Sequence, residues 1–531
     1  MSNYDVVIAG FGPTGAVAAN LLGAAGMRTL VVEPSLTIFD IPRAVHFDGE
    51  VMRTFQALDL HTQISEVTAP GVALGFTNGR NWNLFEQDLS ILPRSQGWDN
   101  SNFFNQPALE AHLRAGLDRY ASVTCCLGER VSGLKQARDH VVLDITHSQG
   151  DDATSRQVST KYLLGCDGAS STIRSALAIN QQDLNCDEPW LVVDWLLPKD
   201  IEINRRAYQI CDPRRPATLV PCEGNHIRWE FMVNADDDLQ AIEKEAKVRQ
   251  LMAPHLHRLS PDLTPDSGHL LRSKVYNFHA LVADTFQRDR VFLLGDAAHQ
   301  TPPFLGQGMC AGIRDAENLC WKIVGVLNNK YPTGLLSTYT TERRAHVYEV
   351  IKTAVGHGRI IQNRNHIAAL LRDCYLCAGR LLPILVGFLR FDLSWPLGAG
   401  LLSKAKPKQS PIGKPIPQAV FAPIDGLGKL TILSDSMLGQ DFTLVGFDVD
   451  LSLISDADST LVAIKHITIR PSKDVIDADG SLAAWAAQHD IKAVLVRPDR
   501  QVFGYCSEHP NLKANIAMLV KDLESQLTTV S

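Results

Sequence analysis

The sequence predicts an α/β fold of three domains, and three observations support this. The 531 residues are too many for one hydrophobic core and suggest about three domains of ordinary size. At the N-terminus, an apolar strand, a glycine turn and an alanine-rich helix follow one another. Two further glycine-anchored segments, Asp167-Gly168 and 295–308, come far along the chain, each after an apolar run. This order indicates a Rossmann-like nucleotide domain that is interrupted and later resumed.

The first segment is a strand, turn and helix unit of the kind that holds a dinucleotide. The apolar run 6–9 predicts a buried parallel strand. Gly10 permits a tight turn, Gly12 lets the backbone approach a pyrophosphate, and Gly15 lets the helix pack on the strand. The next strand ends in Glu33, which is placed to accept hydrogen bonds from an adenosine ribose. Together these features predict dinucleotide binding.

Strand and helix patterns divide the rest of the chain. Alternating strands dominate residues 194–275, which we expect to form a sheet domain set into the nucleotide domain. A stretch rich in Lys and Pro then separates a long helical region from a last α/β segment. The expected boundaries are residues 1–75, 101–180 and 276–403 for the nucleotide domain, 76–100 and 181–275 for the sheet domain, 404–418 for the linker, and 419–531 for the C-terminal domain.

Composition favours small-molecule partners. The net charge of -7 is spread out with no run of basic residues, so nucleic-acid binding is not predicted. The first strand begins too early for a secretory signal, and the apolar run Leu381–Leu389 is too short to span a bilayer. We therefore expect a cytoplasmic protein without stable membrane insertion. The lone CxxC pair Cys374 and Cys377 is expected to be two buried core thiols, and no metal site is predicted.

The second and third glycine segments carry a family resemblance. They are Asp167-Gly168-Ala169-Ser170-Ser171-Thr172-Ile173-Arg174 and Gly295-Asp296-Ala297-Ala298-His299-Gln300-Thr301-Pro302-Pro303-Phe304-Leu305-Gly306-Gln307-Gly308-Met309. Over nearly its whole length the chain resembles the single-component FAD-dependent aromatic hydroxylases, of the para-hydroxybenzoate hydroxylase and phenol hydroxylase type. Within them it is most similar to the 3-(3-hydroxyphenyl)propionate hydroxylases. That similarity is carried by Pro42-Arg43-Ala44, Arg53-Thr54-Phe55-Gln56, Arg228-Trp229-Glu230-Phe231-Met232 and Val494-Leu495-Val496-Arg497-Pro498-Asp499.

The resemblance implies an FAD-binding domain, an inserted β-sheet substrate domain and a thioredoxin-like C-terminal domain. The C-terminal domain contains no CxxC after residue 418, so its expected role is packing or contact between copies, as in a homodimer. The residues implied to hold FAD are Gly10, Gly12, Gly15, Glu33, Arg43, Gln106, Asp167, Asp296, Gly306, Gln307, Gly308 and Met309. The last four should form a helix N-terminus aimed at the N1/O2 edge of the flavin. Two alternatives remain open, since Asp167 would also suit a helix cap and Gln106 a place beside an N-cap.

The implied reaction is hydroxylation of a small phenolic ring, ortho to its hydroxyl. NADH or NADPH reduces FAD, molecular oxygen forms a C4a-hydroperoxide, and its distal oxygen passes to the ring. A base near the substrate hydroxyl is expected because a phenolate is the better nucleophile. Asp48 is the first candidate by the phenol hydroxylase pattern, and His46 is the competing base or a relay. The alternative for Asp48 is the N-cap of a helix that starts near Gly49.

Substrate contacts are expected from the sheet domain and from the third motif. Strand alternation puts Arg228 and Glu230 on one face and Trp229 and Phe231 on the other, so only one pair can line a pocket. Tyr208 is a candidate from another strand. Arg228 would pair with a substrate carboxylate or, alternatively, with solvent, Glu230 or Glu223. The carbonyls of Pro302 and Pro303 are expected to border the substrate and the flavin.

Two alternative functions remain open at this point. One is a tailoring or ring-opening monooxygenase of an aromatic polyketide or quinolone-like heterocycle. The other is a flavoprotein that binds FAD without oxygenating any substrate.

Overall fold

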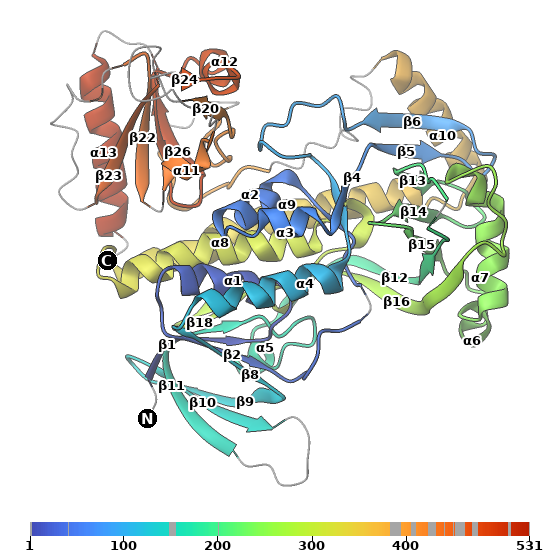
Figure 1. Ribbon diagram of the computed structural model, residues 1–531, viewed down its shortest axis with the longest axis horizontal. Coiled ribbons are helices and arrows are strands. Elements are labelled where there is room, and N and C mark those ends of the chain that lie inside the picture. The colour runs from blue at the N-terminus through green and yellow to red at the C-terminus, as the bar shows by residue number, and fades with distance from the viewer. Residues whose placement is uncertain are drawn as a thin grey trace.

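The computed structural model describes residues 3–40, 42–147, 155–199, 201–382, 395–404, 410–422, 432–439, 441–449, 451, 462–469, 476–507 and 511–529. Within these residues the chain forms two large sheets, long helices beside them and a C-terminal α/β unit (Figure 1). In Figure 1 the first sheet lies at the bottom, the second at the right and the C-terminal unit at the upper left.

The first sheet is the nucleotide-binding core. Its strands follow the order β17-β18-β11-β1-β2-β8, with β9 and β10 extending it beside β11. They are β1 Asn3–Ala9, β2 Thr29–Glu33, β8 Val123–Leu127, β9 Glu129–Gln136, β10 Val141–His147, β11 Ser155–Gly165, β17 Gln287–Arg288 and β18 Val291–Leu293. β1 pairs in parallel with β2 and β11, and β11 with β18, so their carboxyl ends share one edge. Val6, Val7 and Ile8 have no exposed surface because both faces of the sheet are covered.

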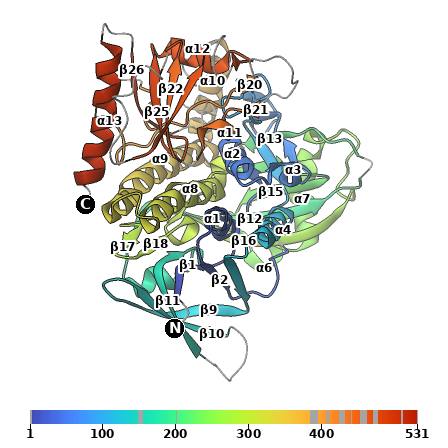
Figure 2. The same ribbon diagram turned by 60° about the vertical axis from the view of Figure 1, so that its left-hand side comes forward.

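Three glycine-anchored segments leave that shared edge. The turn after β1 leads into α1 (Pro13–Ala24), and the segment after β11 leads into α5 (Thr172–Ala176). The segment after β18 leads into α8 (Gly308–Leu327). α4 (Gln106–Ala115) packs beside α1, as Figure 2 shows. The parallel sheet therefore brings together motifs that lie almost 300 residues apart in the sequence.

The second sheet has the order β19-β16-β12-β15-β14-β13-β5-β6. Its strands are β5 Ala73–Thr77, β6 Asn83–Asp88, β12 Gln181–Leu196, β13 Arg206–Ile210, β14 Ala217–Pro221, β15 His226–Met232, β16 His269–Ala283 and β19 His299–Gln300. One face packs in an apolar cluster with α6 (Leu239–Ile242) and α7 (Glu245–Met252). The other face turns toward the first sheet and lines a cavity. A three-stranded sheet of β3 (His46–Phe47), β7 (Asn102–Phe104) and β4 (Thr68–Pro70) lies beside α2 (Gly49–Ala57) and α3 (His61–Ser65).

The C-terminal unit contains a four-stranded sheet of order β23-β22-β25-β26. Its elements are β20 Val420–Ala422, β21 Ile432–Leu433, α11 Asp435–Leu438, β22 Phe442–Phe447, β23 Ile464–Ile469, β24 Ile476–Asp477, α12 Ser481–Gln488, β25 Ala493–Val496, β26 Val502–Cys506 and α13 Leu512–Thr529. Buried ion pairs fasten it to the long helices: Arg497 lies 2.8 Å from Glu342, which also pairs with Lys322 at 2.7 Å. Because removing one partner of such a pair costs about 3–5 kcal/mol, the contact holds the unit in one position.

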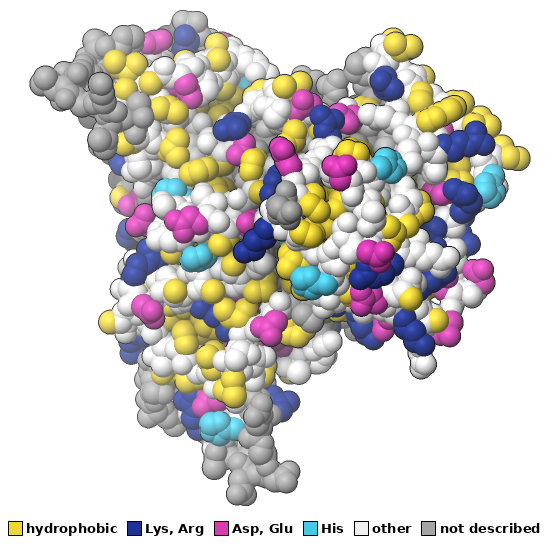
Figure 3. Space-filling view, turned by 45° about the vertical axis from the view of Figure 1, so that its right-hand side comes forward, with side chains coloured by type: hydrophobic (Ala, Val, Ile, Leu, Met, Phe, Trp, Pro, Cys, Tyr) yellow, Lys and Arg dark blue, Asp and Glu magenta, His cyan; other side chains and the backbone are white. Residues whose placement is uncertain are grey.

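The helical region after α8 corrects one sequence expectation. It contains α9 (Thr338–Ile361) and α10 (His366–Leu381), and α10 buries only Ala369, Leu376 and Gly379 along one stripe. Cys374 and Cys377 fall outside that stripe and are exposed, so the expectation of buried thiols was wrong. Hydrophobic side chains gather at the upper right of Figure 3, where α10 lies. Most of the apolar run 381–389 lies outside the described residues.

Among the helices that the structure describes, we find none with the length and apolar character needed to cross a bilayer.

Candidate active site

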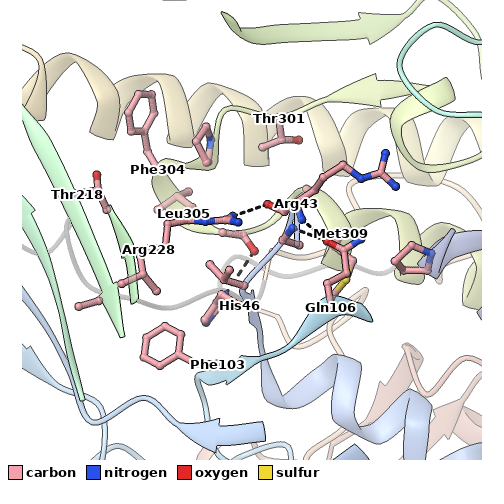
Figure 4. Close-up of a pocket in the computed structure, with 18 of the residues that line it drawn as sticks. Arg43, His46, Phe103, Gln106, Thr218, Arg228, Thr301, Phe304, Leu305 and Met309 are labelled. Carbon is pink, nitrogen blue, oxygen red and sulfur yellow. Dashed lines mark hydrogen bonds between the residues drawn. The ribbon is translucent and has the colours of Figure 1, made fainter. Parts of the chain in front are cut away.

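A cavity of about 310 Å³ lies between the carboxyl edge of the first sheet and the inner face of the second (Figure 4). The first sheet and its loops line it with polar backbone and glycine. The second sheet lines it with the apolar side chains of Ala73, Leu74, Ala207 and Val220 and with the polar side chains of Gln209, Thr218, Arg228 and Glu230. Seven of the twelve residues predicted to bind the cofactor line the cavity: Gly12, Arg43, Gln106, Asp296, Gly306, Gly308 and Met309. Gly10, Gly15, Glu33, Asp167 and Gln307 are not among the residues that line it.

The glycine turn after β1 has the close packing that the sequence predicted. Gly10 has φ +105°, and a Cβ there would lie 2.3 Å from the carbonyl oxygen of Cys166. A Cβ on Gly15 would lie 2.1 Å from the carbonyl oxygen of Gly10. In contrast, a Cβ on Gly12 would meet no atom within 4 Å, because Gly12 opens onto the cavity. The turn therefore presents bare backbone and the start of α1 to a ligand.

Glu33 and Asp167 both hold backbone in place. Glu33 Oε2 accepts from the backbone N–H of Phe11 at 2.7 Å, which ties the end of β2 to the glycine turn. Asp167 accepts from the hydroxyl of Ser171 at 2.6 Å and from the N–H of Ile173 at 3.1 Å. The capping alternative for Asp167 is thus the one that the structure shows.

The segment Pro42–Ala44 is held from two sides. Gln106 Oε1 accepts from the backbone N–H of Arg43 at 2.7 Å and from that of Ala44 at 2.6 Å. Arg228, from the second sheet, donates to the carbonyl of Arg43 at 2.7 Å and to the carbonyl of Pro42. Figure 4 shows Gln106 and Arg228 reaching this segment from opposite sides.

Arg228 pairs with Asp194 rather than with the partners expected for it. The closest approach of its guanidinium to Asp194 is 2.9 Å, and both side chains are buried. Arg272 and His226 reach the same carboxylate at 3.0 Å and 2.9 Å. Burial opposes the ionisation of Asp194, but His226 and Arg228 hold its pKa below the usual value. Arg228 is therefore already occupied by protein partners.

Three polar side chains stand in one row of the cavity wall, and of these the sequence pointed only to Glu230, as a residue on the same strand face as Arg228. Glu230 lies opposite Thr218, and Thr218 lies opposite Gln209, across β15, β14 and β13. Thr218 donates to Gln209 Oε1 at 2.9 Å. Glu230 is 7% exposed, and burial raises its pKa to about 7. Only the strand register, which the sequence does not reveal, aligns these residues.

The remaining substrate candidates divide by strand alternation. Phe231 faces the opposite side of the sheet, where its ring stacks on Trp229 at 5.9 Å. Tyr208 also faces that side, because its neighbours Ala207 and Gln209 line the cavity. The structure brings neither aromatic residue to the site.

Pro303 lines the cavity, whereas Pro302 does not. Beside Pro303, Phe304 and Leu305 line the cavity as well, and neither was predicted.

The third motif places the N-terminus of α8 at the cavity. Gly306 has φ +63°, and the backbone of Gly308 and Met309 follows it into the lining. Gln307 turns away from the cavity and accepts from Arg314 at 3.0 Å. Asp315, which the sequence did not single out, accepts from the N–H of Gly295 at 3.0 Å and lies 2.7 Å from His299 Nε2. These bonds lock the motif against α8.

The structure places the two candidate bases in different surroundings, since only His46 lines the cavity. Asp48 caps α2 by accepting from the N–H of Val51 at 3.1 Å, and its other oxygen accepts from Arg314 at 2.6 Å. Burial alone would raise the pKa of Asp48, but Arg314 holds it below the usual value. His46 does line the cavity, with its Nδ1 3.4 Å from the carbonyl oxygen of Gly306. Burial lowers the pKa of His46, which keeps the imidazole neutral.

Comparison with known proteins agrees with this geometry. Residues 3–354 match the family model described as FAD binding domain, and residues 417–521 match that of the HcaD C-terminal domain. A 3-(3-hydroxy-phenyl)propionate/3-hydroxycinnamic acid hydroxylase of Burkholderia vietnamiensis is 34% identical over 523 residues, which cover 94% of this chain and 93% of that protein. The chain belongs to the FAD-dependent aromatic hydroxylase family. A hydroxylase of the same name from Mycolicibacterium smegmatis is 32% identical over 94% of this chain and 90% of its own length.

Solved structures share the fold. The flavin-dependent monooxygenase PieE, in complex with FAD and substrate, has a TM-score of 0.80 at 19% identity, over 98% of this chain and 99% of that one. Aklavinone-11 hydroxylase, in complex with FAD and aklavinone, has a TM-score of 0.77 at 18% identity, over 98% of each chain. The family match and these neighbours make this chain an FAD-dependent aromatic monooxygenase.

The residues present fit FAD. Gly12 leaves room for a pyrophosphate at the start of α1, since no atom lies within 4 Å of the position of its Cβ. Asp296 is exposed within the cavity, where it can accept hydrogen bonds from ribityl hydroxyls. The N-terminus of α8 offers backbone N–H groups to a flavin ring.

Proposed function

We propose that this chain hydroxylates a small phenolic ring, ortho to its hydroxyl, with NADH or NADPH and molecular oxygen as co-substrates. The observation that carries the proposal is the shared cavity, which is lined both by the N-terminus of α8 and by a wall of the second sheet that combines apolar side chains with one polar row. The names of the curated relatives support a phenolic substrate, because both compounds in them carry a ring hydroxyl.

FAD, held by the glycine turn after β1 and the N-terminus of α8, would supply the electron transfer from the nicotinamide and the transfer of one oxygen atom to the ring. The protein's tasks are to position the ring, exclude water and stabilise charge. Leu74, Leu89, Phe103, Val220 and Phe304 supply apolar surface to the cavity. The backbone N–H groups at the start of α8 would stabilise the negative charge that the flavin ring system gains when it is reduced.

Asp48 and His46 act at the rim of this site. We assign Asp48 a positioning role, because it bonds Arg314 of α8 and caps α2 at once. His46 lies between the Gly306 turn and Phe103, whose ring centroid is 5.9 Å away. As a neutral imidazole in the cavity, His46 can relay a proton.

We also propose that the C-terminal unit is a thioredoxin-like domain with a packing role. Its support is a mixed sheet in which β22 pairs in parallel with β23 and antiparallel with β25, together with α12 and α13. The sequence after residue 418 has one cysteine, Cys506, so a dithiol function has no residues to act through.

The experiment is oxidation of NADH and of NADPH by the purified FAD-loaded protein, with and without a panel of phenols. The proposal expects that a phenol stimulates both nicotinamide oxidation and oxygen uptake, and that a dihydroxylated product appears. A protein that holds FAD, yet consumes oxygen at the same rate with and without every phenol, is a non-oxygenating flavoprotein and refutes the proposal.

A further inference from the structure

The inner face of the second sheet carries one acidic side chain at the cavity, Glu230. It lies on β15 between Val192 of β12 and Thr218 of β14, with Gln209 one strand further. In the part of the chain that the structure describes, its carboxylate accepts no hydrogen bond and forms no ion pair. A buried carboxylate without a protein partner is costly and points to a partner supplied by a ligand.

The charged groups near Glu230 are already committed to one another. Arg228 of β15, Arg272 of β16 and His226 at the start of β15 all contact Asp194 of β12. The titratable and charged groups that line the cavity from the other side are His46, Arg43, Cys166 and Asp296. Burial lowers the pKa of His46, which leaves its imidazole neutral, and burial raises the pKa of Asp296. Glu230 is therefore the acidic side chain that the second sheet presents to the cavity, and the nearest cations on that sheet, Arg228 and Arg272, are already paired with Asp194.

We propose that Glu230 accepts the ring hydroxyl of the substrate and takes its proton, which makes it the general base of the hydroxylation. This role rests on the proposed function. The O–H bond breaks, the proton moves to a Glu230 oxygen, and the electron pair stays on the ring oxygen, which activates the ortho carbon. The same geometry selects a substrate whose end at the sheet is a neutral hydroxyl, because a carboxylate there would face Glu230 while Arg228 and Arg272 are already paired with Asp194.

Glu230 is better placed to act as the base than Asp48 or His46, the two candidates from the sequence. Asp48 has both oxygens bonded within the protein and does not line the cavity. His46 is a weak base because burial lowers its pKa. A general base works best when its pKa lies near the operating pH, and the pKa of Glu230 is about 7. Gln209, with its Oε1 fixed by Thr218, leaves its amide N–H groups to steady the ring oxygen.

The test compares the FAD-loaded wild type with Glu230→Gln and with the control Glu223→Gln. Glu223 lies in the turn between β14 and β15 and does not line the cavity. Hydroxylation is measured on phenols of decreasing pKa, from weakly acidic phenols to fluorinated phenols already ionised at the assay pH. FAD content and the thermal midpoint are recorded for each protein, so that a folding defect is recognised. Glu230→Asp serves as a second variant that keeps the carboxylate.

Glu230→Gln should lower kcat/KM for weakly acidic phenols by about two to four orders of magnitude. With phenols that are already ionised, kcat/KM of Glu230→Gln should lie much closer to the wild-type value. The rising limb of the wild-type kcat/KM profile near pH 7 should disappear in Glu230→Gln and persist in Glu230→Asp.

An equal loss on all phenols with an unchanged pH profile, or no loss at all, overturns the role of Glu230. A wild type that hydroxylates no phenol overturns the proposed function, and this role with it.

Discussion

Replacing Glu230 by glutamine should make the protein more stable at alkaline pH, whatever it does to activity. Burial raises the pKa of Glu230 from its ordinary 4.5 to about 7. Below about pH 4.5 both the folded and the unfolded chain hold this proton, so the carboxyl has no effect on stability. Between about pH 4.5 and about pH 7 the unfolded chain releases the proton first, so the folded state loses stability as the pH rises. At about 1.36 kcal/mol per pKa unit, the loss amounts to about 3 kcal/mol above pH 7.

The assay is denaturant unfolding of wild type and Glu230→Gln at about pH 4.5 and about pH 8, at one FAD concentration. The stability difference between the two proteins should grow by about 3 kcal/mol from the lower to the higher pH in favour of the variant. The free-energy cost of burying the glutamine amide does not depend on pH, because the amide does not titrate, so this cost cancels when the two pH values are compared. Glu223→Gln should show no such change. A difference that is constant with pH refutes the burial argument for Glu230.

Four other variants test separate parts of the site. Arg228→Met leaves Asp194 with fewer cations and removes the donor to the Pro42–Ala44 segment. We therefore expect the free energy of unfolding to fall by about 3 kcal/mol and FAD to be retained less well, as measured by denaturant unfolding and by the FAD content per protein. Full FAD retention would contradict this expectation. Gly15→Ala should give no FAD-loaded protein, because its Cβ would lie 2.1 Å from a carbonyl oxygen. Gly12→Ala should fold and bind FAD less tightly, and equal unfolding midpoints for the two glycine variants would contradict the packing argument. Asp48→Asn should cost about 2 kcal/mol at neutral pH through its bond to Arg314. Because the pKa of Asp48 is depressed, that cost should begin to shrink as the pH falls below 3.8, the ordinary pKa of the group, and should vanish below the depressed pKa of the folded state, as acid titration of the unfolding midpoint will show.

The sequence was sufficient to predict features that are formed by residues close together in the chain. The glycine turn required Gly10 and Gly15 because strand and helix meet within six residues, and that spacing is visible in the sequence. The N-cap at Asp48 was also visible as an alternative, because the helix begins at the next residue. Alternation on β15 showed that Arg228 and Glu230 share a face, since side chains alternate along any strand.

The sequence was insufficient to predict contacts between residues that lie far apart in the chain. Arg314, the partner of Asp48, is 266 residues away and is brought close only by the packing of α8 against α2. The row of Glu230, Thr218 and Gln209 depends on the register of three strands, which the order of residues leaves open. The pairing of Arg228 with Asp194 arises in the same way, from β12 lying beside β15.

The most direct test of the central claim is the origin of the oxygen in the product. Wild-type protein loaded with FAD would be given a phenol and NADH or NADPH under heavy-isotope O₂, and the product would be examined by mass spectrometry. We expect one labelled oxygen atom on the ring, next to the original hydroxyl. Nicotinamide oxidation that yields only hydrogen peroxide and unchanged phenol, for every phenol tried, would contradict it.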